Sequence, residues 1–158
     1  MISDATTQAL LDRMDITDLL YRYASSIDRK DIDGVRGTFA DDLWAQYGNA
    51  EPMVGGDTVA KWIDEATRDC VWQHHLLSVY HVDIAGDTAK ALVYHTSHQV
   101  FRSDPDTAHV LVARYHDELK RADDGWKLSR LVFEILWGER RTDTTGYLKE
   151  LGGPGPQI

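Results

Sequence analysis

Hydrophobic residues recur at helical spacing in the first part of the chain. Because residues three and four apart lie on one side of a helix, this spacing predicts an amphipathic helix from about residue 10 to residue 29 or 30. Asp31 is of a type that caps helices, and it predicts a short second helix running to about Phe39. The apolar positions of the first helix are Ile16, Leu19, Leu20, Tyr23, Ala24 and Ile27.

Shorter elements follow. Residues 43–47 are rich in large side chains and precede a turn-forming Gly-Asn pair, which predicts a brief strand. We expect a third helix after the Gly-Gly-Asp sequence at 55–57, capped by Asp57 or Thr58. Its buried side would carry Val59, Trp62, Ile63 and Ala66.

The second half of the chain has a different pattern. Three turn signals separate four β-prone runs, each about twice the usual length of a strand, which predicts a strongly twisted meander bent by bulges. Helices followed by strands indicate an α+β fold in which the long helix packs across a curved antiparallel sheet. We expect one domain over residues 1–145 and a partly flexible tail over 146–158. The four runs are residues 72–84, 88–102, 108–121 and 126–138.

Composition and charge exclude several classes of protein. The chain of 158 residues has 26 acidic and 17 basic residues, a net charge of −9, and no basic run longer than two, so we expect no nucleic-acid partner. The longest stretch without Asp, Glu, Lys or Arg, residues 71–82, is too short to cross a bilayer. The first residues do not resemble a secretion signal, and we expect a cytoplasmic protein. Cys70 is the one cysteine and predicts no internal disulfide.

All seven histidines lie between residues 74 and 116, within three predicted strands. Their spacing does not favour a metal site, because adjacent strand residues point to opposite faces and no HExxH or paired-cysteine motif is present. His74 has mainly apolar neighbours at even-numbered positions, which places it on the buried face as either a core residue or a site residue. We expect His75, His81, His109 and His116 at the surface or at a sheet edge.

Asp28 has an unusual place for an acid. It lies in the last turn of the first predicted helix, where the helix dipole disfavours a negative charge, and beside the apolar stripe. A solvated Asp at the end of a helix is one interpretation. The other is that the helix lies across the sheet and brings Asp28 to His74 at the start of a strand.

Several short segments, in this order and spacing, resemble the SnoaL-like branch of the nuclear-transport-factor-two-like superfamily. The likeness covers about residues 10–140 and implies a cone-shaped α+β barrel. It is nearest in kind to scytalone dehydratase, hexachlorocyclohexane dehydrochlorinase and bile acid 7α-dehydratase. The segments are Tyr23 to Asp28, Trp72 to His75, Gly86 to Ala89, Ala113 to Leu119, Gly125 to Lys127 and Leu136 to Glu139.

The resemblance implies site residues and a reaction. Asp28 and His74 match the family's dyad, which abstracts a proton without a cofactor, and Tyr23 matches a tyrosine of the bile acid enzyme. Scytalone dehydratase has a tyrosine directly before its Asp, where this chain has Ile27, and this departure argues against scytalone as the substrate. A second histidine of that enzyme aligns with His98 only across a gap, and this likeness implies that His98 is a pocket residue.

The remaining pocket residues are expected from their chemistry. Tyr47, like Tyr23, is a candidate hydrogen-bond donor. Arg114 lies within a strand, where it would pair with Glu134, contact a partner chain or hold an anionic group of the substrate; we favour the pair with Glu134. Aromatic and aliphatic side chains of this kind line pockets for small hydrophobic, cyclic molecules or form an ordinary core. The expected lining residues are Trp44, Trp62, Phe133, Ile135 and Trp137.

The sequence therefore favours a lyase, a dehydratase or another β-eliminating enzyme, with His74 as base, Asp28 orienting it and Tyr23 assisting. One alternative is an isomerase or polyketide cyclase with Asp28 itself as the base. Another is a noncatalytic ligand-binding protein or a subunit like the small subunits of ring-hydroxylating dioxygenases. The resemblance also implies a homodimer or homotrimer.

Overall fold

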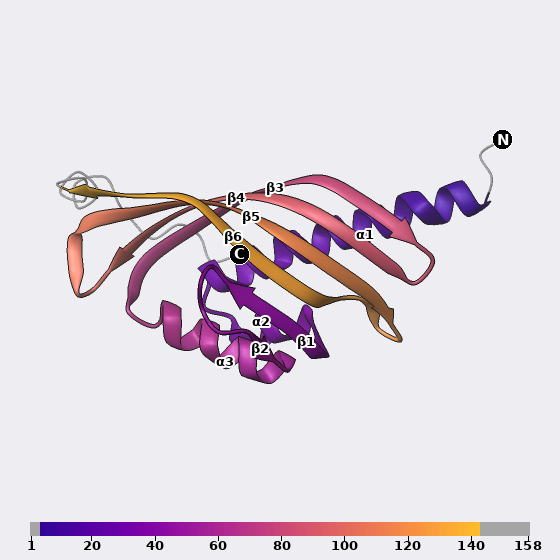
Figure 1. Ribbon diagram of the computed structural model, residues 1–158, viewed down its shortest axis with the longest axis horizontal. Coiled ribbons are helices and arrows are strands. Elements are labelled where there is room, and N and C mark those ends of the chain that lie inside the picture. The colour runs from indigo at the N-terminus through magenta and orange to yellow at the C-terminus, as the bar shows by residue number, and fades with distance from the viewer. Residues whose placement is uncertain (1–3, 143–158) are drawn as a thin grey trace.

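A computed structural model describes residues 4–142, so the tail expected at 146–158 lies outside the described residues. Three helices and six strands make an α+β fold, as predicted (Figure 1). The helices are α1 (Asp4–Asp28), α2 (Ile32–Gly37) and α3 (Gly56–Thr67). The strands are β1 (Phe39–Tyr47), β2 (Met53–Val54), β3 (Cys70–Ala85), β4 (Thr88–Phe101), β5 (Asp104–Ala122) and β6 (Gly125–Thr142).

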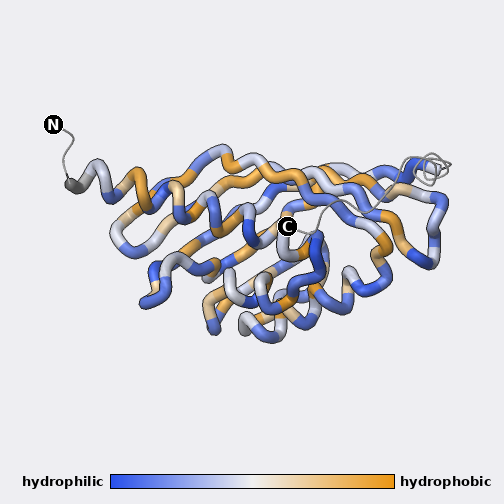
Figure 2. Tube along the Cα trace, turned by 180° about the vertical axis from the view of Figure 1, so that it is seen from behind, coloured by the Kyte–Doolittle hydropathy of each residue, from blue (hydrophilic) through white to orange (hydrophobic). Residues whose placement is uncertain are grey.

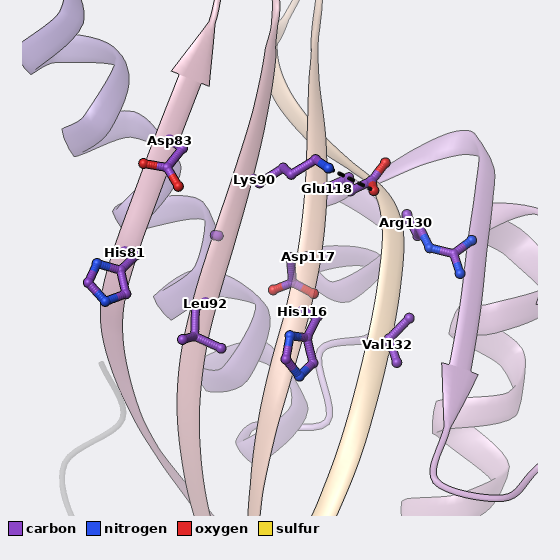
Figure 3. A pocket seen from close by; sticks show the side chains of 10 residues that line it. His81, Asp83, Lys90, Leu92, His116, Asp117, Glu118, Arg130 and Val132 are labelled. Atoms are coloured by element: carbon purple, nitrogen blue, oxygen red, sulfur yellow. Dashed lines mark ion pairs between the residues drawn. The ribbon is translucent and has the colours of Figure 1, made fainter.

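One curved sheet contains all six strands in the order β2-β1-β6-β5-β4-β3. Every neighbouring pair is antiparallel except β1 and β6, which are parallel. The sheet is not closed, because β2 and β3 form its two edges, so the expected cone is an open one. All three helices lie on one side of the four long strands (Figures 1 and 3). We call that side the inner face and the other side the outer face.

The predicted apolar stripe of α1 forms the centre of the core. Ile16, Leu20 and Tyr23 are at most 2% exposed and pack in one cluster with Val93 and Leu131 of the sheet. Along the strands, hydrophobic and hydrophilic residues alternate, as expected for a sheet with one covered face (Figure 2). The burial of apolar side chains between α1 and the sheet therefore fixes the position of the last turn of α1 against the sheet.

Two predicted helix caps have different outcomes. Asp31 caps α2 as expected, since its carboxylate accepts the backbone N–H of Gly34 at 2.9 Å. The predicted caps of α3 are wrong, because Gly55 is the N-cap residue and makes no side-chain hydrogen bond there. Gly55 has a φ of 100°, a conformation that glycine adopts without strain. Asp57 lies instead in the first turn of α3.

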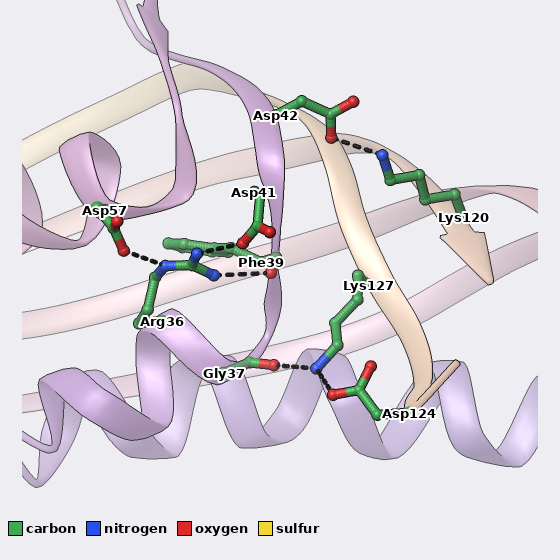
Figure 4. Close-up of polar contacts among 9 residues, drawn as sticks. All are labelled: Arg36, Gly37, Phe39, Asp41, Asp42, Asp57, Lys120, Asp124 and Lys127. Carbon is green, nitrogen blue, oxygen red and sulfur yellow. Dashed lines mark hydrogen bonds and ion pairs between the residues drawn. The ribbon is translucent and has the colours of Figure 1, made fainter. Parts of the chain in front are cut away.

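Charged side chains join these short elements to one another (Figure 4). The Arg36 guanidinium of α2 pairs with Asp41 of β1 and with Asp57 of α3. The Lys127 ammonium of β6 donates to the carbonyl oxygen of Gly37 at 2.7 Å. β1 begins at Phe39 rather than at the predicted residue 43, since α2 ends at Gly37 and the chain passes directly into the sheet.

Candidate active site

The end of α1 carries an acid that binds one histidine twice. The Asp28 Oδ1 atom lies 2.5 Å from His75 Nδ1, and Asp28 Oδ2 accepts the backbone N–H of His75 at 3.0 Å. The side chain of Asp28 is 22% exposed and that of His75 is 8% exposed. Because Asp28 holds Nδ1, the other ring nitrogen of His75, Nε2, is the one left to act on a ligand. It has no hydrogen bond to another described residue.

Polar contacts fasten the end of α1 to the start of β3. Gln73 Nε2 donates to the carbonyl oxygen of Ile27, the residue before Asp28. Lys30, which has a φ of 57° just after the helix, donates from Nζ to the carbonyl oxygen of Cys70 at 2.7 Å. These contacts bracket the pair of Asp28 and His75, so its geometry is set by the backbone of both elements.

The predicted partner of Asp28 was wrong by one residue. His74 is exposed on the outer face beside Trp72, whereas His75 lies on the inner face. The prediction assumed that one set of alternating positions stays buried along the whole strand. A register shift between Val79 and His81 breaks that alternation, because it adds one residue to β3. The inner face consequently carries odd-numbered residues before the shift and even-numbered residues after it.

A cavity of about 170 Å³ lies beside His75 between α1, α3 and the inner face. Its size is close to the roughly 150 Å³ of an engineered cavity that binds benzene. No Lys or Arg is among its described lining residues, so the site is suited to an uncharged molecule. The lining residues are Tyr23, Ile27, Tyr47, Trp62, Ile63, Ala66, Thr67, His75, His95, Ser97, Gln99, Leu111, Tyr115 and Phe133.

His95 is a buried histidine whose two ring nitrogens have no hydrogen-bond partner in the described part of the chain. The residue is 2% exposed, and its ring contacts those of Tyr115 and Phe133. Burial, together with the nearby His75, lowers the pKa of His95 to about 3. At neutral pH this imidazole is therefore uncharged and offers one donor and one acceptor that only a ligand or water can satisfy.

Three tyrosine side chains gather at the inner end of the cavity. The hydroxyls of Tyr23 and Tyr47 lie 2.9 Å apart, and the ring of Tyr23 meets that of Tyr115 edge to face. Burial raises the pKa of each hydroxyl well above its usual range, so all three stay protonated and can donate. The Trp62 ring stacks on Tyr47, with 4.7 Å between ring centres.

Asp117 is an acid buried on the same face, two residues from Tyr115. It is 3% exposed, and its Oδ1 atom has no hydrogen-bond partner among the described residues. Burial raises the pKa of Asp117 well above its ordinary range. Burial therefore favours the neutral form of this carboxyl group near the tyrosines.

Some predicted pocket residues line the cavity and others do not. Tyr23, Tyr47, Trp62 and Phe133 line it, as predicted. Trp44 does not, because it lies on the outer side of β1 beneath the Arg130 guanidinium. The other predicted lining residues that lie elsewhere are His98, Ile135 and Trp137.

The reasons differ among these three residues. His98 of β4 lies opposite His74 of β3 in the strand register, on the outer face. Ile135 is half exposed and lies close to Gly48. Trp137 reaches the outer face because β6 carries an extra residue opposite the step from Val112 to Ala113, so its expected alternation fails there.

The structure adds site residues that the sequence reasoning missed. His95, Ser97 and Gln99 line the cavity from β4. The pattern that could have identified these residues is the alternation along β4, in which the odd-numbered residues from Ala89 to Ser97 are all buried. Within the described residues, no group of three or more His, Cys, Asp or Glu side chains is arranged to hold a metal ion, and no helix is long and apolar enough to span a membrane.

Comparison with known proteins places the chain among similar domains. An uncharacterized protein of Mycobacterium tuberculosis is 28% identical over 122 residues, which cover 77% of this chain and 83% of that protein. The structure of a candidate aromatic ring hydroxylase from Novosphingobium aromaticivorans matches with a TM-score of 0.75 and 26% identity, covering 87% of this chain and 96% of the other.

Two further solved structures share the fold at lower identity. A candidate scytalone dehydratase from Novosphingobium aromaticivorans has a TM-score of 0.78 and 16% identity, covering 85% of this chain and 90% of its own. Hexachlorocyclohexane dehydrochlorinase LinA-type3 from Novosphingobium barchaimii has a TM-score of 0.76 and 15% identity, covering 84% and 92%. A model of the SnoaL-like domain matches residues 8–132, most of the sequence, and the chain therefore belongs to the SnoaL-like domain family.

Proposed function

We propose that this protein is a cofactor-independent lyase that eliminates water or another small leaving group from a compact, uncharged cyclic molecule. The observation that carries the proposal is the pair of Asp28 and His75, held at 2.5 Å with the free imidazole nitrogen at an apolar cavity. The solved structures that share the fold include proteins named for dehydration and dehydrochlorination, which supports the choice of reaction class.

The proposed reaction begins at His75. Its Nε2 atom takes a proton from a substrate carbon, the electron pair of that C–H bond forms a C=C bond, and the leaving group departs with its own bonding pair. Asp28 fixes the tautomer and orientation of the ring and stabilises the imidazolium that forms. In a dehydration, the proton taken by His75 leaves with the departing hydroxide as water, so the protein returns to its starting state.

The tyrosines and His95 supply the polar contacts of the substrate. One hydroxyl of the Tyr23–Tyr47 pair donates to the other, and the hydroxyl that accepts keeps its own hydrogen to donate to the leaving group or to an oxygen that gains negative charge. The unpartnered nitrogens of His95 would bind a hydroxyl or carbonyl group. Since the described lining includes no cationic side chain, a carboxylate or phosphate would bind poorly beside Asp28.

The same geometry argues against Asp28 as the base. Both of its carboxylate oxygens are already engaged by His75, one by the ring and one by the backbone. A carboxylate with both oxygens occupied is poorly placed to reach a substrate carbon. An isomerase that uses His75 as its base would share the first step, the removal of a proton from carbon, and would return that proton to another carbon. A cyclase would share the same step, but its carbanion would attack a carbonyl carbon to form a C–C bond, and the proton would pass to the carbonyl oxygen.

The proposal is tested with cyclic β-hydroxy ketones and hexachlorocyclohexane as probes. Formation of the conjugated enone is followed by absorbance, chloride release by ion measurement, and uptake of deuterium at the acidic carbon by NMR. We expect at least one probe to be turned over, and Asp28→Asn to lower kcat/KM by about 10²-fold or more. The control is Asp33→Asn, which removes an exposed acid of α2.

Each outcome has a definite meaning. Deuterium uptake without elimination would support the base and contradict the lyase, in favour of an isomerase. Full turnover by Asp28→Asn would contradict the dyad. No turnover and no deuterium uptake with any of these probes, together with copurification of a larger oxygenase component, would support the noncatalytic alternative.

A further inference from the structure

A second hollow, of about 520 Å³, adjoins the cavity beside His75. Gln99 of β4 and Leu111 of β5 line both spaces, so the two meet at these side chains. The proposed elimination uses none of the residues that line the second space alone. We call this second space the side hollow. Its further lining residues include Phe101, His109, Gly138 and Arg140.

Strand register leads from the proposed base into the side hollow. The row of the sheet that contains His75 crosses four neighbouring strands and ends at Gly138. The next row lies towards the hairpin that joins β4 to β5, which extends beyond α3 (Figure 1). A molecule whose ring lies against His75 can therefore extend a substituent along the sheet. The two rows are His75-Ser97-Leu111-Gly138 and Gln73-Gln99-His109-Arg140.

Gly138 leaves the floor of the side hollow without a side chain. It is the only glycine of the described strands that does not begin or end its strand. Its φ is not positive, and the extra residue of β6 lies two positions earlier, at Leu136. A Cβ atom at Gly138 would lie 3.5 Å from Leu111 Cδ1 and 3.6 Å from the carbonyl oxygen of Val110, which are ordinary contact distances. Neither the backbone nor the packing requires this glycine, although glycine weakens a strand, and a ligand that approaches closely explains it.

The charged side chains around the side hollow already have partners of opposite sign. Arg140 Nη2 donates to Asp104 Oδ2 at 2.6 Å, and His109 Nε2 lies 3.4 Å from the same oxygen. Glu139 pairs with Arg141. An anion here would compete with Asp104, and a cation would compete with Arg140. The side hollow is therefore suited to an uncharged group.

Gln99 offers a polar contact where the two spaces meet. Its side chain is half-buried, and its amide has no hydrogen bond to another described residue. An amide is both a donor and an acceptor, so it can pair with a carbonyl or amide group of a ligand. Leu111 and Phe101 add apolar contacts beside it, and the ring of Phe101 meets that of His109 edge to face at 5.0 Å.

We propose that the substrate carries an uncharged side chain on its ring, and that this side chain lies over Gly138 in the side hollow with a carbonyl or amide group on Gln99. The inference rests on the proposed function, because it takes the ring to lie in the cavity beside His75. Contacts remote from the reacting carbon then hold the ring against the base and select among ring compounds.

Binding of ketones that have no leaving group tests this proposal without turnover. The probes are cyclohexanone alone, with a pentyl chain opposite the carbonyl, and with chains of equal length that end in an amide or in a carboxylate. NMR titration of the backbone amide signals gives the Kd of each probe. We expect the amide chain to lower the Kd of the bare ring about tenfold or more, and the pentyl chain to lower it less. The carboxylate chain should bind no better than the amide chain.

Two substitutions locate the chain of the probe. Gly138→Leu fills the side hollow and should abolish the gain from the amide chain, while the Kd of cyclohexanone stays within about twofold. Gly138→Ala is the matched control, since it adds only the Cβ atom for which there is room, and it should keep most of the gain. Gln99→Leu keeps the size of the side chain and should reduce the preference for the amide chain over the pentyl chain about fivefold. The amide spectra also check that each variant is folded.

The outcomes separate this inference from the proposed function. An amide chain that adds no affinity, or a gain that survives Gly138→Leu, would overturn the side hollow as a binding site. Tighter binding of the carboxylate chain than of the amide chain would overturn the uncharged class of the substituent. A gain from the amide chain in a protein that eliminates nothing would support the side hollow and contradict the lyase. Elimination from bare rings with no gain from a chain would support the lyase and contradict the side hollow.

Discussion

Polar side chains have opposite environments on the inner and outer faces of the same four strands. On the inner face, His95 and Asp117 are buried with ring or carboxyl atoms that have no partner among the described residues. On the outer face, Arg114 and His116 are both hydrogen-bonded to the Glu134 carboxylate. Buried polar groups without partners are costly to keep, so their presence on the inner face, where His95 lines the cavity, marks that face as the place for chemistry.

Two adjacent histidines give the sharpest test of this comparison. We expect His75→Ala to lower kcat/KM by about 10²- to 10⁴-fold, because it removes the proposed base. His74→Ala removes the same side chain from the outer face and should leave kcat/KM within about twofold. Steady-state kinetics with the probe identified by the activity test measures both.

The two variants also separate the proposed roles. If both variants lost activity equally, the faces would not differ in function and the assignment of His75 would be wrong.

The same pair shows what the sequence could predict. The apolar spacing of α1, the Asp31 cap and the four long strands followed from local pattern. The strand ends were predicted to within four residues, whereas α1 begins at Asp4, about six residues before its predicted start. The face of the sheet on which His74 lies did not follow from local pattern, because it depends on an extra residue near Val79 that shifts the alternation of buried and exposed positions. A bulge changes the register of one strand against its neighbour, and that pairing is not contained in the pattern of a single strand.

The prediction for Trp137, which lies nearer the end of the sheet, was wrong for the same reason. Trp137 was assigned to the cavity with Phe133 because their positions differ by an even number, and the extra residue in β6 turns Trp137 outward. Asp28 was identified correctly as the unusual acid, since its place at a helix end beside an apolar stripe is a local property. His95 was missed because only the packed structure shows that its ring nitrogens have no partner.

His95 predicts how the stability of the fold depends on acid. Burial lowers its pKa in the folded protein to about 3, below the ordinary value of 6.5, so the unfolded chain binds a proton first as the pH falls. The contribution to stability is complete above pH 6.5 and is lost progressively towards pH 3. Between pH 8 and pH 5 we expect a loss of about 2 kcal/mol in the free energy of unfolding.

Urea unfolding at several pH values measures this loss. His95→Gln should remove most of the decrease between pH 8 and pH 5, because glutamine does not titrate. His81→Gln, which changes an exposed histidine of the outer face, is the control and should keep the wild-type profile. An unchanged profile for His95→Gln would mean that the buried imidazole is not the source of acid sensitivity.

Asp117 predicts the opposite dependence on pH. Its pKa in the folded protein is raised by burial, so the folded state is favoured at low pH and loses stability as the pH rises above the value of the unfolded chain. Asp117→Asn keeps the size of the side chain and removes the charge. We expect it to be more stable than wild type by about 1 kcal/mol or more at pH 8 and equal to it near pH 3.

The neighbouring acid on the outer face is the matched control for this variant. Glu118→Gln changes a residue that is exposed, and it should alter stability by less than about 0.5 kcal/mol at any pH. If Asp117→Asn were less stable than wild type at pH 8, the ionised carboxylate would have a partner in the folded state, and the description of the inner face would have to change.

The smallest effect is expected from the ion pairs of the outer face. Glu134→Gln removes the acceptor shared by Arg114 and His116, but these side chains are 41%, 31% and 51% exposed, so water replaces much of what is lost. The free energy of unfolding, measured by urea, should fall by about 0.5 kcal/mol. The pKa of Glu134 is lowered by His116 and Arg114, so this difference should vanish as the pH falls below the ordinary range of a glutamate. A loss of free energy as large as that predicted for His95 would show that paired charges on an open face affect the stability of this sheet as strongly as buried groups do. The two faces would then differ in the reactions that their side chains can carry out, and not in how much their polar groups contribute to the free energy of unfolding.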